Sequence, residues 1–337
     1  QKFFTEMLNN PDTEFLGLRG LLNQAMKLED RADALKWARR AYVLKPESEW
    51  VARTLFDLAS RAGLWAEADE ALSGAVRKKQ ISAIDARRPK AVLGHQLSIE
   101  AEADGDKTKA LKLSKKTSDD AREFIPGLVR YADLLENSGK HRKAANTLEG
   151  GWGISPHPEL AKAYWPLSGS EDAMARMKAA QKLAGFNPND PATAMMLARA
   201  ALDANLWGDA RQKLEMIGGS DEPATSSYCQ LMAELEEAEH SDMIAAREWL
   251  VRAANAEPDP AWVCSDCGNA ASTWTALCGS CGGFDTFQWH RPPRVPGQIS
   301  SEPPVANLMA PEATDKEPAK LSAPEAATDI DAPSAPQ

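Results

Sequence analysis

The feature that most constrains the fold is an internal repeat of roughly 34 residues, which runs from Phe15 to about Pro260. In the clearest units, small and apolar residues recur at helical spacing in two stretches, separated by a turn residue such as Gly63 or Gly139, whereas the third, fifth and seventh units are degenerate. Small side chains let two antiparallel helices approach closely, and a proline such as Pro46 stops the second helix. We expect units to begin near Phe15, Glu49, Ala91, Ile125, His157, Pro191 and Ser227.

This pattern resembles the tetratricopeptide repeat, in which each unit is a pair of helices and stacked units form a solenoid. Trp65, His141 and Trp207 hold equivalent positions just past the turns of their units. The predicted fold class is therefore all-α: a tetratricopeptide-type α-solenoid of about seven repeats over residues 15–260. The expected working surface is its concave face, which would bind proteins. The repeats contain no nucleophile–base pair, phosphate loop or carboxylate dyad, so we expect no enzymatic activity.

A second feature is the clustering of four of the five cysteines within residues 261–290. They form two C-x-x-C-G knuckles, in which the bend directs two thiolates at one metal and the glycine permits the turn. Two such knuckles complete a tetrahedral four-sulfur site of the rubredoxin-like or zinc-ribbon kind. The predicted metal ligands are Cys264, Cys267, Cys278 and Cys281.

Four thiolates suit either zinc or a single iron. We expect a structural Zn²⁺, because so small a unit needs a metal to fold. Iron-based electron transfer and a thiol–disulfide switch are the alternatives. The aromatic residues of the module would supply its small core and a docking face: Trp262, Trp274, Phe284, Phe287 and Trp289.

Charge argues against a nucleic-acid partner. The formal net charge is −10, and residues 261–290 contain no Lys or Arg that could contact phosphate. Residues 1–150 carry 26 basic and 23 acidic side chains, whereas residues 151–337 carry 13 and 26. We therefore expect the first half to face an anionic membrane surface.

The two ends of the chain differ from the repeats. Residues 291–337 hold ten prolines, seven acidic residues and no aromatic residue, so a disordered Pro/Ala/Glu-rich tail is expected. Residues 1–14 would be the end of a truncated preceding repeat, because Phe4, Leu8 and Pro11 lie where its second helix should end.

The remaining candidate ligands are isolated. Cys229 is interpreted as a small buried residue in a repeat helix. The five histidines are scattered and are interpreted as surface or capping residues: His95, His141, His157, His240 and His290. The absence of a C-x-x-C-H motif excludes covalent haem attachment, which leaves non-covalent ligation.

Two segments, together with the terminal cysteine module, resemble the HemY-type proteins of alphaproteobacteria. They are Gly151-Trp-Gly-Ile-Ser-Pro-His-Pro-Glu-Leu-Ala161 and Pro11-Asp-Thr-Glu-Phe-Leu-Gly-Leu-Arg-Gly20. The resemblance covers residues 1–292. It implies a bacterial inner-membrane protein with two membrane helices before Gln1 and a repeat domain on the cytoplasmic face.

The same resemblance implies a scaffold of late haem biosynthesis that contacts haem-pathway enzymes and handles haem non-covalently. The chain also resembles LapB-type proteins, which join such repeats to a rubredoxin-like module and regulate lipopolysaccharide synthesis through protein contacts. An adaptor of envelope synthesis is therefore an alternative, and an iron-binding electron-transfer protein is another.

Overall fold

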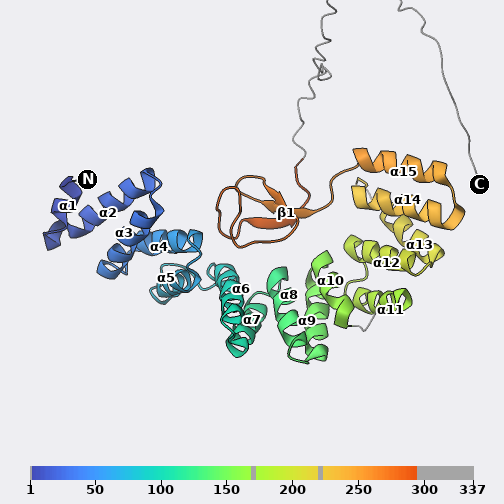
Figure 1. Cartoon of the computed structure of the whole chain (residues 1–337), viewed down its shortest axis with the longest axis horizontal. Helices are drawn as coiled ribbons and strands as arrows, with labels where there is room; N and C mark the ends of the chain where they lie inside the picture. Colours follow the sequence, from blue (N-terminus) through green and yellow to red (C-terminus); the bar gives the residue numbers. More distant parts are fainter. Residues whose placement is uncertain (1, 168–171, 219–222, 294–337) are drawn as a thin grey trace, which may run out of the picture. The chain divides into compact units, whose positions relative to one another are not determined.

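The computed structural model describes residues 2–167, 172–218 and 223–293 (Figure 1). The predicted disordered tail lies almost wholly in residues 294–337, outside these described residues. The helices are α1 (Lys2–Met7), α2 (Pro11–Lys27), α3 (Arg31–Leu44), α4 (Glu49–Arg61), α5 (Trp65–Arg77), α6 (Arg87–Ala103), α7 (Lys107–Asp120), α8 (Ile125–Glu136), α9 (His141–Ile154), α10 (Pro158–Leu167), α11 (Ala173–Ala184), α12 (Pro191–Asp203), α13 (Trp207–Gly218), α14 (Ser226–His240) and α15 (Met243–Asn255).

From α2 onward the helices pack as consecutive pairs, each against the next, and the predicted solenoid class is confirmed. Trp65, His141 and Trp207, which the repeat alignment placed in equivalent positions, are the first residues of α5, α9 and α13. Alanines from paired helices, such as Ala38 and Ala198, are fully buried. Their small side chains let the helix axes approach.

The turns between the two helices of a pair share one backbone feature, a residue in the left-handed region of φ/ψ space. Gly63, Gly105 and Gly139 supply it with φ of 72°, 84° and 72°. Glu29 and Ser241 adopt the same conformation with φ of 55° and 54°. A side chain at such a position costs roughly 1–2 kcal/mol, which glycine avoids.

The start of the solenoid differs from the prediction. Pro11 does not close a preceding helix but opens α2, since Asn10 caps that helix by accepting a hydrogen bond from the N–H of Asp12. Pro is favoured at this first helical position because its missing N–H is not needed there. Helix α2 begins at Pro11 and α6 at Arg87, slightly before the unit starts expected near Phe15 and Ala91.

Helix α1 lies directly on α2. A Cβ added at Gly20 would come within 2.4 Å of the Phe4 ring, so this glycine provides the space for the contact. No helix in the described ranges combines the length and apolarity needed to cross a membrane.

The segment after α15 forms a three-stranded antiparallel sheet of order β2-β1-β3, from β1 (Ala261–Cys264), β2 (Ala270–Ala271) and β3 (Phe287–His290). The linker before β1 is fixed to the last helix pair. The Asp259 carboxylate accepts hydrogen bonds from the backbone N–H of Ser227 at 3.1 and 3.2 Å and from its hydroxyl at 2.7 Å, at the start of α14. The sheet therefore begins from a defined point on the solenoid.

The turn geometry predicts opposite effects of two matched substitutions. Gly63→Ala should lower the free energy of unfolding by about 1 kcal/mol, because alanine is strained at positive φ. No atom lies within 4 Å of a Cβ added at Gly63, so the effect is one of backbone alone. Glu29→Gly should raise the free energy of unfolding by roughly 0.5–1 kcal/mol. Urea unfolding followed by circular dichroism measures both, and an unchanged Gly63→Ala midpoint would contradict this account of the turns.

Candidate metal centre and docking surface

The two cysteine knuckles share one hydrogen-bond pattern. In the first, the N–H of Cys264 donates to the Asn269 carbonyl and the N–H of Gly268 donates to the Cys264 carbonyl. In the second, the N–H of Cys278 donates to the Gly283 carbonyl and that of Gly282 to the Cys278 carbonyl. Gly268 and Gly282 have φ of 73° and 70°. These are the glycines that the sequence pattern required for the turns.

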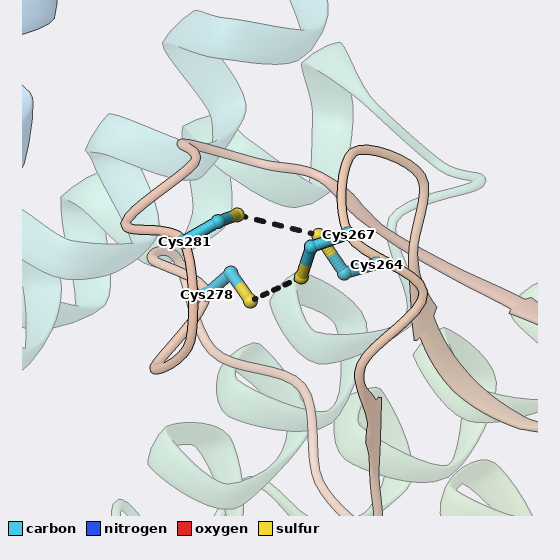
Figure 2. Close-up of side chains that lie close together, drawn as sticks. All are labelled: Cys264, Cys267, Cys278 and Cys281. Atoms are coloured by element: carbon cyan, nitrogen blue, oxygen red, sulfur yellow. Dashed lines mark hydrogen bonds between the residues drawn. The ribbon is translucent and has the colours of Figure 1, made fainter.

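The structure brings the four predicted cysteines together. Their sulfur atoms all lie within 4.8 Å of one another, and Figure 2 shows the side chains converging on one point. Cys264 Sγ lies 3.7 Å from Cys281 Sγ, and Cys267 Sγ lies 3.7 Å from Cys278 Sγ. Sulfurs bound tetrahedrally to zinc at about 2.3 Å are about 3.8 Å apart. The four cysteines are thus close enough to bind one metal ion.

The electrostatics of the cluster favour a cation. Burial opposes ionisation of the Cys264 thiol, but hydrogen bonds with the Thr286 hydroxyl and with the backbone of Cys267 and Asp266 outweigh it and lower the pKa to about 6. The backbone of Gly283 favours the Cys281 thiolate, yet burial and the other cysteines raise its pKa to about 12. The thiols cannot all ionise together unless a positive charge replaces their protons.

Most aromatic side chains of the module face the solenoid. Phe287 is buried, whereas Trp262, Trp274, Phe284 and Trp289 contact helices of the repeats. The aromatic residues of the module therefore do form a docking face, and this face contacts the solenoid at three sites.

Trp274 occupies the first docking site, on α6 and at the start of α8. Its ring centroid lies 4.9 Å from that of Phe124 and 5.5 Å from that of His95, both edge-to-face. Such arrangements of aromatic rings are favourable beyond the area that they bury. All three side chains are buried, and neither His95 Nδ1 nor Trp274 Nε1 has a hydrogen-bond partner in the described part of the chain.

Trp262 and Trp289 occupy the second docking site, at the start of α10. The His157 ring lies 4.2 Å from Trp289 and 5.2 Å from Trp262, centroid to centroid. Trp262 Nε1 donates to the Glu159 carboxylate at 2.7 Å. His157 also caps α10, since its Nδ1 accepts from the N–H of Glu159 at 3.1 Å.

Phe284 and Asp285 occupy the third docking site. The Phe284 ring packs between Phe56 and Trp65 with centroid distances of 5.3 and 6.4 Å. The Asp285 carboxylate accepts two hydrogen bonds of 2.8 Å from the Nε and Nη2 atoms of Arg88. Fork-to-fork pairs of this kind are among the stronger ionic contacts in proteins.

The histidine interpretation needs a correction. His95 and His157 are not surface residues, although His157 does cap a helix as expected. Burial lowers the pKa of each to about 4, aided at His95 by the Arg130 charge. His141, His240 and His290 are exposed, and Cys229 is buried as predicted. Sequence reasoning missed Arg88 and Glu159, because their partners are far away along the chain.

No protein-family model matches the chain. A curated relative, the probable magnetosome protein Mms48 of Magnetospirillum gryphiswaldense, is 30% identical over 237 residues, or 70% of this chain and 52% of the relative. The chain thus spans about half the length of that protein. It is related to Mms48 over the matched residues and has the tetratricopeptide-type solenoid fold described above.

Several solved repeat proteins show a likeness at low similarity. A tetratricopeptide repeat protein from Parabacteroides merdae is 13% identical with a TM-score of 0.35, covering 72% of this chain and 92% of its own. The C-terminal part of a repeat protein from Cytophaga hutchinsonii is 15% identical with a TM-score of 0.36, covering 69% and 94%.

The buried histidines predict that acid weakens docking. A histidine whose pKa is 6.5 in the unfolded chain and about 4 in the folded, docked chain favours the folded, docked state above pH 6.5 and loses that contribution as the pH falls toward 4. For His95 the loss between pH 7.5 and pH 5 should be about 2 kcal/mol. Stability measured against pH should therefore fall less steeply in His95→Leu than in the wild type. Parallel curves would show that His95 does not titrate on undocking.

The sulfur cluster predicts a local response to the loss of one cysteine. Cys278→Ser should release the metal and expose residues 261–290 to protease, while the far-ultraviolet signal of the helices stays largely intact. Metal content by mass spectrometry and limited proteolysis give the readout. Cys229→Ser is the matched control and should keep the metal, since Cys229 lies in α14 outside the cluster. Stoichiometric metal in the Cys278→Ser protein would remove Cys278 from the ligand set.

Proposed function

We propose that the protein is a non-enzymatic adaptor whose helix pairs bind other proteins and whose four-cysteine module is a structural zinc unit. The observation that carries the proposal is that the repeats already hold a folded polypeptide segment. Residues of α4, α6 and α10 bind it through aromatic contacts, one bidentate ion pair and one indole–carboxylate hydrogen bond. A surface that binds one polypeptide by these means has the chemistry to bind another.

Zinc is the proposed metal, held by Cys264, Cys267, Cys278 and Cys281. Its role would be to fix the two knuckles so that the module keeps the shape that fits the solenoid. Iron is the alternative ion, and the absorption spectrum separates the two, since iron–thiolate protein is coloured and zinc protein is not.

The proposed process is late haem biosynthesis at the cytoplasmic face of a bacterial inner membrane. It is supported by the resemblance of Gly151–Ala161 and of the cysteine module to HemY-type proteins. The partners would include haem-pathway enzymes. Any haem ligand should come from the exposed His141, His240 or His290, because His95 and His157 are buried under the module.

A second candidate process follows from the relative, whose name assigns it to the magnetosome. An adaptor of that organelle would use the same repeat surface with different partners. LapB-like control of envelope synthesis is a third process for the same adaptor chemistry.

The adaptor proposal predicts a residue-specific loss of partner capture. Trp50 is the second residue of α4, and Arg88 holds the same position in α6. Trp50 is 36% exposed, and the Arg19 guanidinium lies above its ring. Trp50→Ala should weaken capture of the cognate partner from cell extract about tenfold or more, as expected for an aromatic anchor.

The matched control is Val43→Ala on α3, whose side chain is 82% exposed. Val43→Ala should leave capture unchanged, and equal loss in both variants would contradict binding through the first helices. Mass spectrometry of the captured proteins separates the processes: enzymes of haem, magnetosome or envelope synthesis each support one candidate.

A further inference from the structure

The loop carrying Phe284 and Asp285 is seated on the solenoid in the manner of a bound peptide. The Phe284 ring meets Phe56 edge-to-face at 5.3 Å, and the Asp285 carboxylate takes the Arg88 guanidinium in a bidentate pair. The Asp285 side chain is 11% exposed. Two adjacent residues of the module thus fill one apolar and one cationic position, contributed by α4, α5 and α6.

The receiving groups are positioned by the solenoid itself. The Arg88 guanidinium carbon lies 4.3 Å from the centroid of the Phe124 ring, a cation–π contact between two residues of the solenoid. Phe56 and Trp65 pack against a core that includes the buried Ala59 and Leu72. The site is therefore preorganised, which lowers the cost of binding a ligand.

The internal loop is held there under strain. Asp285 has φ of 52°, in the left-handed region, which Asp adopts more readily than most residues but still at a cost relative to glycine. Burial also raises the pKa of Asp285 above its ordinary value in spite of the lowering effect of Arg88. A peptide that is free of the second cysteine knuckle would place the same two side chains without the backbone strain.

We propose that this site on α4, α5 and α6 recognises a partner peptide with an aromatic residue followed by Asp or Glu, and that the Phe284–Asp285 loop is its internal competitor. The inference rests on the proposed adaptor function and names the chemistry of its partner. The aromatic residue enters between Phe56 and Trp65, and the carboxylate pairs with Arg88.

The test uses the full chain and a fluorescent peptide with the sequence of residues 282–288. The internal copy competes at an effective concentration in the millimolar range. The double variant Phe284→Ala/Asp285→Asn should therefore bind the peptide at least about tenfold more tightly than the wild type. Adding Arg88→Gln should reduce that affinity about tenfold or more, since a charge-assisted pair is lost. A peptide with Ala-Asn in place of Phe-Asp is the control.

A second variant, in which the charge at position 88 is reversed, tests the proposal if the double variant folds poorly. Arg88→Glu repels the internal Asp285 and should bind a peptide with Phe-Arg about tenfold better than the Phe-Asp peptide, reversing the preference of the native site. Circular dichroism and metal content show that each variant remains folded.

Equal affinity for the Phe-Asp and Ala-Asn peptides, or no effect of Arg88→Gln, would overturn the inference. So would a wild-type dimer that becomes monomeric in the double variant, because the site would then take the loop of a second copy. Peptide binding is measured without any cellular partner. A positive result with failed capture from extract would therefore reject the adaptor proposal alone.

Discussion

Four sulfur atoms lie within 4.8 Å of one another in a module whose large side chains mostly contact the solenoid. A segment as short as residues 261–290 cannot bury enough apolar surface to fold alone, and here most of its aromatic rings contact the repeats. The proposed zinc ion, bound by the four cysteines, would supply the missing constraint. With the knuckles fixed, the indole and phenyl groups are presented at three separate sites of the solenoid. On that proposal, the docked state would depend on the geometry at sulfur.

The contact between module and solenoid contains both favourable and unfavourable interactions. Its aromatic anchors, the Arg88–Asp285 fork and the Trp262–Glu159 hydrogen bond are the contacts expected at the centre of a protein interface. Three buried polar atoms lie unpaired among the described residues of the same surface: His95 Nδ1, His157 Nε2 and Trp274 Nε1. Each such atom costs about 1–3 kcal/mol. An interface with this balance is specific in its geometry yet less stable than its area suggests, which suits a contact that can be exchanged.

The sequence predicted the local features well, because each rests on residues that are near one another along the chain. The helix-pair period, the turn glycines Gly63 and Gly139 and the two knuckles all follow from short-range patterns. Boundaries were less exact, as at α2, where a proline that looked like a helix stop is a helix start. The docking partners could not be found this way. Arg88 and Asp285 are 197 residues apart in the sequence. No local pattern around His95 indicates that Trp274 packs against it.

The attachment of the linker to α14 through Asp259 has a consequence for the whole array. In most solenoids each repeat touches only its neighbours, so unfolding can start at one end and advance unit by unit. Here the module is tied to α14 through Asp259 and to α4, α6 and α10 through its side chains, which joins units that are distant in order. Such a cross-brace adds long-range contacts to a fold otherwise built of local ones. Unfolding of the middle units is then coupled to unfolding of the last helix pair. The described repeats therefore unfold more cooperatively than a stack without such contacts.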